Sequence, residues 1–227
     1  MAIFLDTGNF KEIKHYFEMG IIRGVTTNPS IMSKEKDINS FSSMKQKCIE
    51  IAKLIDPLPL SIEVLSNDRD EMIKQSIDFS SWATNINVKI TIHGPNGELE
   101  NLKVINYLSK EKKIKINVTA MMSAQQCLLS AFAGAEYVSI FGGRVNNMGY
   151  DSIIEIKKLR NVLDSLNLNS KIIVGSTREV INIFDWINAG AHIVTSTPHL
   201  LNSMIIHPYT KETVKMFMDD AKKINFE

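Results

Sequence analysis

A lysine in an otherwise apolar, β-branched stretch is the residue with the greatest chemical potential in this chain. Lys89 lies within 87–91 (NVKIT), a pattern that predicts a buried strand. Burying an ammonium group is costly unless it is paired or neutralised, and burial favours the nucleophilic, uncharged amine. Such an amine is suited to forming a Schiff base with a carbonyl substrate. An edge-strand lysine that reaches into water is the alternative, and this stretch alone leaves both open.

Period-two alternation sorts the side chains of each predicted strand onto two faces. In 87–91 the apolar Val88 and Ile90 share one face, whereas Lys89 lies on the other. Six successive strands place polar or ionisable groups on that second face near their carboxyl ends. Besides Lys89, these groups are Asp6, Thr26, Asn28, Ser61, Glu63, Asn117, Thr119 and Ser139. One inward polar residue could be a satisfied core hydrogen bond, but six strands with this pattern indicate a functional site.

The two inward carboxylates, Asp6 and Glu63, supply the acid–base groups that carbonyl chemistry needs. One would move protons while a carbinolamine loses water, and the other would take a proton from a hydroxyl as a C–C bond breaks. A structural ion pair with Lys89 is the alternative role for either carboxylate. The amides and hydroxyls of Asn28, Asn117 and Ser139 suit a polyhydroxylated substrate.

Two arginines follow late predicted strands and indicate an anion site. Arg144 lies in 141–144 (FGGR), and Arg178 lies in 175–178 (GSTR), where Ser176 is a candidate helix N-cap or anion ligand. Gly-rich loops and helix starts after late barrel strands bind phosphate, and arginine supplies forked donors for it. Either arginine alone could be solvated at the surface or paired at a helix end, but together they favour a phosphate site.

These groups are positioned by a regular alternation of strands and helices. The predicted strands are 3–6, 25–28, 60–64, 87–91, 115–119, 137–141, 171–176 and 192–196. The predicted helices are 10–19, 41–54, 71–82, 99–108, 124–132, 153–166, 179–187 and 213–224. Alternation of this kind predicts an α/β fold with parallel strands, and eight units predict a single (β/α)8 TIM barrel over 1–227 with a C-terminal helix near 210–224. A doubly wound open sheet is the alternative, but no Gly-x-Gly-x-x-Gly follows the first strand.

Composition and charge narrow the classes of partner. The chain has 227 residues, 44% of them hydrophobic, and a formal net charge of +1, so nucleic acid and anionic membranes are not expected partners. We expect Cys48 and Cys127 to be buried free thiols, which indicates a protein from a reducing compartment. The five histidines show no metal-ligand spacing, and no leader or apolar run of about 18 residues is present. We therefore expect a cytoplasmic protein that uses no metal or cofactor.

Several motifs, taken in order, resemble those of the transaldolases, a class I Schiff-base family that also contains fructose-6-phosphate aldolases. The matching runs are 4–7 (FLDT), 25–30 (VTTNPS), 61–64 (SIEV), 88–90 (VKI), 117–119 (NVT), 139–144 (SIFGGR) and 175–178 (GSTR). The run 26–30 (TTNPS) is highly specific, and the matches extend in family order from residue 4 to about 208.

The resemblance implies a reaction that moves a dihydroxyacetone unit from a ketose phosphate to an aldose phosphate. It implies that Lys89 forms the Schiff base, that Asp6 is the acid/base at the hydroxyl beside the broken bond, and that Glu63 and Thr119 handle protons through a water. It further implies substrate contacts for Asn28, Thr27, Asn117, Ser139 and Phe141, and phosphate contacts for Arg144, Ser176 and Arg178. The resemblance also implies a homo-oligomer, because small members of the family form ring-like assemblies in which a C-terminal helix packs on a neighbour.

Two positions separate the branches of this family. Transaldolases resemble this chain in having Glu at position 63 and Phe at position 141, whereas fructose-6-phosphate aldolases tend to have Gln and Tyr. A tyrosine hydroxyl can help water release free dihydroxyacetone, and Phe141 cannot, so transfer is favoured. The alternatives are a reversible aldolase acting on free dihydroxyacetone or an unusual sugar, and a non-catalytic barrel that binds sugar phosphates. Thr91 stands where the family usually has Pro, and with the loop 92–98 (IHGPNGE) and Gly142-Gly143 it could reshape the acceptor pocket.

Overall fold

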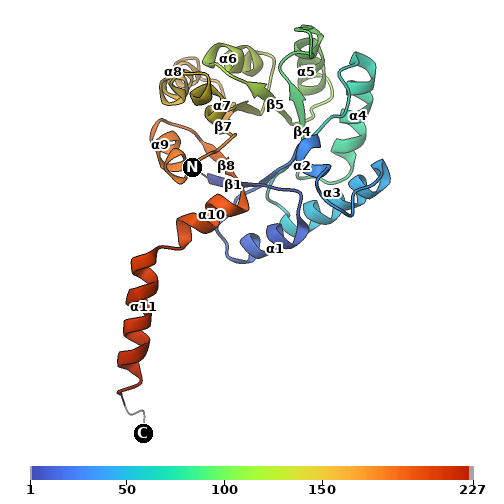
Figure 1. The fold of residues 1–227 in the computed structure, drawn as a ribbon. Coiled ribbons are helices and arrows are strands. Elements are labelled where there is room, and N and C mark those ends of the chain that lie inside the picture. Colours follow the sequence, from blue (N-terminus) through green and yellow to red (C-terminus); the bar gives the residue numbers. More distant parts are fainter. Residues whose placement is uncertain (1, 225–227) are drawn as a thin grey trace.

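Eight short parallel strands close on themselves in the computed structural model, which describes residues 2–224 (Figure 1). The strands are β1 (Ala2–Asp6), β2 (Val25–Thr26), β3 (Leu60–Glu63), β4 (Ile86–Thr91), β5 (Ile116–Met121), β6 (Tyr137–Ile140), β7 (Lys171–Val174) and β8 (Ile193–Ser196). Each strand pairs with its sequence neighbours, and β8 pairs with β1. The predicted (β/α)8 barrel is therefore confirmed, and the open sheet is excluded.

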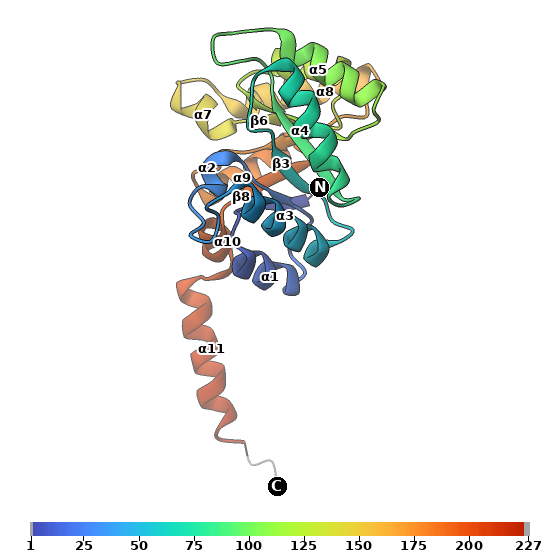
Figure 2. The same cartoon turned by 90° about the vertical axis from the view of Figure 1, so that its right-hand side faces the viewer.

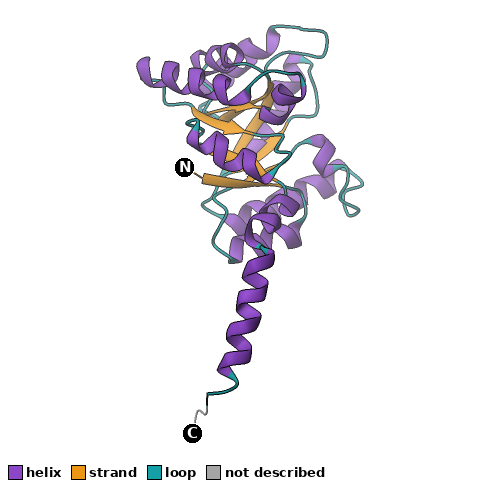
Figure 3. Cartoon of the chain, turned by 60° about the vertical axis from the view of Figure 1, so that its left-hand side comes forward, coloured by secondary structure: helices purple, strands orange, loops and turns teal. Residues whose placement is uncertain are grey.

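Helices lie outside the closed sheet, and all except the last of them stay close to it (Figure 3). They are α1 (Phe10–Glu18), α2 (Pro29–Met32), α3 (Phe41–Ile55), α4 (Arg69–Ser81), α5 (Glu100–Lys110), α6 (Ala124–Phe132), α7 (Gly142–Asn147), α8 (Ser152–Ser165), α9 (Val180–Asn188), α10 (Pro198–Ile205) and α11 (Pro208–Ala221). The long helices match the predicted ones within about two residues, except that α11 begins five residues before the predicted 213 and ends three residues before the predicted 224. The short helices α2, α7 and α10 were not predicted, because an apolar period needs more residues than α2 and α7 contain.

Two strands, β2 and β7, end two residues earlier than predicted, at the open end of the barrel. β2 stops at Thr26 rather than at the predicted residue 28, because Asn28 caps α2 by accepting a hydrogen bond from the Ile31 amide, with Pro29 at the first helical position. β7 stops at Val174 rather than 176, and Ser176 beyond it adopts a left-handed φ of +60° that departs from extended strand geometry. Both departures place a functional group on a loop instead of a strand.

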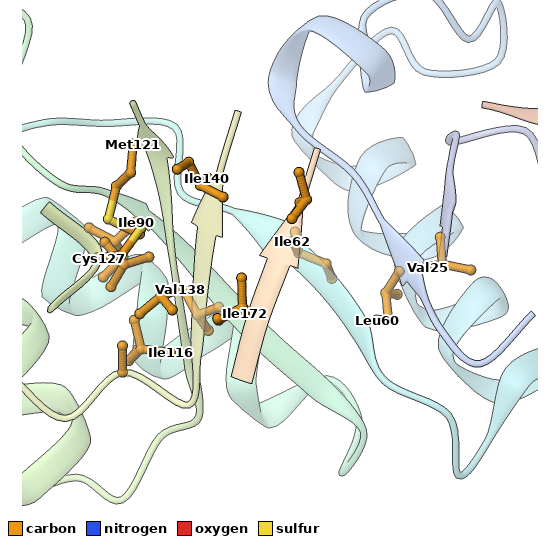
Figure 4. Close-up of a cluster of buried hydrophobic side chains, with 14 of the residues drawn as sticks. Val25, Leu60, Ile62, Ile90, Ile116, Met121, Cys127, Val138, Ile140 and Ile172 are labelled. Carbon is orange, nitrogen blue, oxygen red and sulfur yellow. The ribbon is translucent and has the colours of Figure 1, made fainter. Parts of the chain in front are cut away.

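The outward strand residues form the main core between the barrel and its helices. Figure 4 shows part of this layer, in which Ile62, Ile90 and Val138 pack among other branched side chains. Inside the barrel, a smaller apolar group of Phe4, Tyr137, Ile173 and Ile193 fills the space toward the amino ends of the strands. The predicted sorting of faces is confirmed, and the apolar interior stops below the polar residues of the site.

The last helix extends away from the barrel instead of covering it. Figure 2 shows α11 projecting beyond α10, and none of the residues in Pro208–Ala221 is buried. The predicted helix near 210–224 is thus present, shifted toward the amino terminus. Among residues 2–224, no helix is both long enough and apolar enough to cross a membrane.

Candidate active site

A cavity of about 440 Å³ opens at the carboxyl ends of the strands. Ten of the twelve residues predicted for the site line it, although they come from six different strands or the loops that follow them. They are Asp6, Asn28, Lys89, Asn117, Thr119, Ser139, Phe141, Arg144, Ser176 and Arg178. The carboxyl end is where barrel enzymes place their catalytic groups, so the fold and the polar pattern point to one place.

Lys89 is buried at the base of this cavity, with only 5% of its surface exposed. Its Nζ donates a hydrogen bond to the backbone oxygen of Thr27 at 2.8 Å and lies 3.2 Å from Oε2 of Glu63. Glu63 and Lys89 are direct partners in the pairing of β3 with β4, so the ion pair follows from the strand register. The alternative of a lysine reaching into water is therefore wrong.

Asp6 lies at the end of β1, in the wall of the same cavity. Its Oδ1 accepts a hydrogen bond of 2.6 Å from the Thr26 hydroxyl. Burial raises the pKa of Asp6 above its ordinary value, while the positive charge of Lys89 and the Thr26 hydrogen bond act in the opposite direction. A carboxyl held in this balance can both accept and return a proton.

An ordered row of polar side chains crosses the inner face beside the lysine. Ser139 donates to Oδ1 of Asn117 at 2.6 Å, and Nδ2 of Asn117 donates to Ser61 at 3.1 Å. Asn117 is also the pairing partner of Lys89 between β4 and β5. This chain of hydrogen bonds fixes the orientation of the Asn117 amide. The polar groups of Asn117 and Ser139 that line the cavity suit the hydroxyls of a sugar.

Thr119 carries a buried hydroxyl that has no hydrogen-bond partner among residues 2–224. It follows Asn117 on β5, where the register with β6 shifts between Val118 and Met121 and Ala120 adopts a strained φ of +60°. A buried hydroxyl without a partner is costly, so this atom is suited to bind a water or a substrate group.

The two predicted arginines line the same cavity from the segments that follow β6 and β7. A Cβ atom added to Gly143 would lie 1.8 Å from the backbone oxygen of Ser176, so only glycine permits this close approach of the two loops. The guanidinium of Arg144 lies over the ring of Phe141, 5.4 Å from its centre. Arg144, Ser176 and Arg178 thus form one cationic wall of the cavity.

Two predicted residues do not line the cavity, and each has a physical reason. The Thr27 hydroxyl donates to the backbone oxygen of Ser61 at 2.8 Å, and its side chain is fully buried on the face opposite to Thr26 and Asn28. Only the Thr27 backbone reaches the site, so the structure does not place its side chain where it would contact substrate. Glu63 lies behind Lys89 and contacts the amine instead of the cavity.

The unusual Thr91 and the loop after it also lie outside the cavity wall. Asn101, which is buried on α5, donates to both the backbone oxygen and the hydroxyl of Thr91 at 3.0 Å. Neither Thr91 nor any residue of 92–98 lines the cavity. The expectation that they reshape the acceptor pocket therefore finds no support in this geometry.

Sequence patterns missed the wall that comes from the region after β2. Ser30, Ile31, Lys34 and Glu35 line the cavity from α2 and the turn that follows it. A helix of four residues gives too little periodicity to be found, and although Ser30 belongs to the run 26–30, no pattern marks Ile31, Lys34 or Glu35. Thr195 was also missed, although period-two alternation applied to β8 would have placed it on the inner face.

The barrel, the buried lysine with its neighbouring acids and the cationic wall define an enzyme of the aldolase type. The family model for transaldolase/fructose-6-phosphate aldolase matches residues 3–227. A probable transaldolase of Clostridium acetobutylicum is 41% identical over 224 residues, which cover 98% of both chains. A probable transaldolase of Carboxydothermus hydrogenoformans is 38% identical over 220 residues, with 97% of both chains covered. The chain belongs to the transaldolase/fructose-6-phosphate aldolase family.

Solved structures with little sequence similarity show the same fold. A putative phosphonomutase from Burkholderia cenocepacia superposes with a TM-score of 0.61 at 14% identity, covering 98% of this chain and 92% of that one. Thiamine phosphate pyrophosphorylase from Pyrococcus furiosus gives a TM-score of 0.61 at 9% identity, covering 86% and 85%. At such identities the likeness concerns the barrel alone.

The raised pKa of Asp6 predicts a pH-dependent effect of Asp6→Asn on stability. Ionised Asp6 destabilises the native state above its raised pKa, and an amide cannot ionise. We expect Asp6→Asn to raise the melting temperature at pH 8 by about 2–4 °C. This gain should shrink as the pH falls through the raised pKa and disappear below the ordinary value of 3.8.

Thermal unfolding from pH 3.5 to 8, followed by circular dichroism, measures this difference. Asp220→Asn, at an exposed position of α11, is the control and should leave the curve unchanged. A larger gain at acid pH than at pH 8 would contradict the assignment.

Proposed function

We propose that this protein transfers a dihydroxyacetone unit from a ketose phosphate to an aldose phosphate through a Schiff base on Lys89. The observation that carries the proposal is the placement of the Lys89 amine at the base of the cavity, 3.2 Å from Glu63. The amine is also close enough to Asp6 for its charge to lower the pKa of that carboxyl against the rise caused by burial. Membership of the family supports the same class of reaction. No other lysine among the cavity-lining residues is buried, since Lys34 is exposed.

The first half of the reaction requires a nucleophile and a proton carrier. Lys89 loses a proton to Glu63 and attacks the ketone carbon, and the resulting carbinolamine loses its hydroxyl as water to give an iminium ion. Glu63 is close enough to return the proton that this hydroxyl needs. The Thr119 hydroxyl, which has no partner among residues 2–224, can hold the water on that side.

The second half breaks and reforms a C–C bond. Asp6 takes the proton of the hydroxyl next to the bond, the bond electrons pass to the iminium ion, and an aldose phosphate leaves an enamine on Lys89. The enamine then attacks the aldehyde of a second aldose phosphate, and Asp6 returns its proton to the new hydroxyl. Hydrolysis of the iminium ion releases the product ketose and restores the amine.

The cavity offers two kinds of group for substrate binding, amides and hydroxyls on one side and arginines on the other. The fixed Asn117 amide, Ser139 and the Nδ2 group of Asn28 suit the hydroxyls of the dihydroxyacetone unit, since Oδ1 of Asn28 already caps α2. Arg144, Arg178 and Ser176 suit the phosphate at the other end. Sugar phosphates are therefore the substrates that we propose.

Schiff-base formation predicts covalent trapping of one lysine. Incubation with fructose 6-phosphate and sodium borohydride should add one reduced three-carbon unit to a peptide that contains Lys89, as detected by mass spectrometry. Lys89→Met should remove both the label and the activity, because no amine remains at the base of the cavity. Lys115→Met, at an exposed position before β5, is the matched control and should label normally. Labelling that survives Lys89→Met would overturn the mechanism.

The second candidate function is aldol cleavage with release of free dihydroxyacetone, and Phe141 separates the two. Phe141 lines the cavity without a hydroxyl that could activate water at the enamine. We expect Phe141→Tyr to raise the ratio of released dihydroxyacetone to transferred unit by about tenfold or more. Product analysis with and without an acceptor aldose measures the ratio. Phe141→Leu is the control for lost ring packing, and a wild-type ratio in Phe141→Tyr would count against this role.

We also propose that the protein acts as a homo-oligomer in which α11 packs on a neighbouring copy. Val214, Phe217, Met218 and Ala221 lie on one face of α11, and the first three are at least half exposed. An exposed apolar stripe of this kind, on a helix none of whose residues is buried against the described part of the chain, supports a partner at this surface.

Light scattering coupled to size exclusion tests the assembly. The wild type should exceed the chain mass of 25.6 kDa by an integral factor. Val214→Asp with Phe217→Asp should lower that mass, whereas Met216→Asp, on another face of the helix, should lower it less. A wild-type protein that elutes at the mass of one chain would refute the proposal.

A further inference from the structure

We propose that Thr195 is a positioning residue that acts on Asp6 through Thr26, so that the proton taken from the substrate is received at Oδ2 of Asp6. This inference rests on the acid–base role proposed for Asp6. Neither threonine is among the twelve residues predicted for the site, although Thr26 is one of the inward polar residues of the run 25–30. Both line the cavity, and each contributes to one continuous line of hydrogen bonds.

Three adjacent strands bring these side chains together on the inner face of the barrel. β1 lies between β8 and β2, and Asp6 is the pairing partner of Thr26. The Thr26 hydroxyl donates to Oδ1 of Asp6 at 2.6 Å, and it lies 2.6 Å from the Thr195 hydroxyl. Both hydroxyls are almost fully buried, so water does not compete strongly for these hydrogen bonds.

The number of protons decides the direction of each hydrogen bond. An ionised carboxylate only accepts, and a threonine hydroxyl has a single proton to donate. Because Thr26 gives its proton to Asp6, it must accept from Thr195, which is the donor in the second bond. The order Thr195 to Thr26 to Asp6 is therefore the one that satisfies all three groups when Asp6 is ionised.

This order has a consequence for the reaction. Oδ1 of Asp6 is engaged as an acceptor, whereas Oδ2 has no hydrogen-bond partner among residues 2–224. A proton abstracted from a substrate hydroxyl is then received at Oδ2, where it stays available for return to the product. Hydrogen bonds in a chain polarise one another, so Thr195 strengthens the bond from Thr26 to the carboxylate.

Thr195 is itself held in place by its surroundings. The Thr177 hydroxyl donates to the backbone oxygen of Thr195 at 2.7 Å. A Cβ atom added to Gly175 would lie 3.3 Å from the Thr195 methyl group, so Gly175 leaves the room that this methyl needs. A β-branched side chain has few rotamers, and the packed methyl thereby directs the hydroxyl.

The other charged groups around the cavity do not depend on Thr195. Lys89 approaches Asp6 from β4, with Glu63 behind it on β3. Lys34 and Glu35 lie in the wall contributed after β2, and Arg144 and Arg178 lie in the wall contributed after β6 and β7. Changing the Thr195 hydroxyl leaves each of these charges in place, so a shift in Asp6 titration reports on the line of hydrogen bonds.

The test measures the titration of Asp6 directly, in protein labelled with carboxyl-¹³C aspartate and assigned by comparison with Asp6→Asn. Burial raises the pKa of Asp6, and loss of a donor raises it further. We expect a further rise of about one unit in Thr26→Val and about half a unit in Thr195→Val. Thr195→Ser keeps the hydroxyl but loses the methyl that directs it, so its titration should lie closer to that of the wild type than that of Thr195→Val does, and the double valine variant should match Thr26→Val alone. Thr213→Val, on α11, is the control.

Enzyme kinetics then tests whether this titration matters for the reaction. The acid limb of kcat/KM should move to higher pH by the same amount in each variant, because only ionised Asp6 can take the proton. The alkaline limb should stay in place.

The outcomes separate this inference from the proposed function. An unchanged Asp6 titration in Thr195→Val, or shifts that add in the double variant, would overturn the relay whatever the activity. An acid limb that does not follow the titration, while Lys89 is still trapped by borohydride, would overturn the positioning role. Failure of wild-type trapping refutes the Schiff-base function instead, and the titration of Asp6 still decides whether the hydrogen-bond line exists.

Discussion

The burial of a charged lysine beside carboxylates is the constraint on which the rest of the structure depends. Removing Lys89 and Glu63 from water carries a large desolvation cost, which their mutual attraction offsets only with good geometry and further hydrogen bonds. The structure supplies both, since the amine lies 3.2 Å from Glu63 and donates to the Thr27 backbone at 2.8 Å. Such a pair contributes little to stability, so its presence is better explained by chemistry than by folding.

A closed barrel is suited to support such a pair because it separates two tasks. The outward faces of its strands form the main apolar core with the helices, and that core supplies the stability. The inward faces near the open end are then free to carry polar groups that would weaken an ordinary core. The raised pKa of Asp6, the Thr119 hydroxyl without a partner among residues 2–224 and the strained backbone at Ala120 and Ser176 all lie at this end. Natural proteins concentrate such local conflicts at functional sites.

The cationic wall depends on a different constraint, the close approach of two loops. Gly143 lies against the backbone of Ser176 so tightly that no side chain fits between them. This contact brings together arginines that are 34 positions apart in the chain, Arg144 and Arg178. In the proposed function, the forked donors of the two arginines bind the phosphate while Lys89 reacts with the carbonyl at the other end of the substrate. The proposed function would use this arrangement as a reacting end at Lys89 and a phosphate end at the two arginines.

The barrel and the inward side chains of Asp6, Lys89, Asn117, Thr119 and Ser139 could be predicted from sequence, because strand periodicity places alternate side chains on one face whatever the surroundings. The glycine-rich motifs after late strands predicted Arg144, Ser176 and Arg178. Phe4, Asp6, Lys89 and Asn117 lie where this period puts them. The same period places the Thr27 side chain on the outer face, but it could not show that the Thr27 backbone oxygen accepts a hydrogen bond from Lys89, since that bond joins two distant segments. Nor could it show the wall from Ser30 to Glu35, or the meeting of Thr195, Thr26 and Asp6 across the closure of β8 on β1. Local periodicity is a property of the chain, whereas contacts between distant segments exist only once the barrel closes.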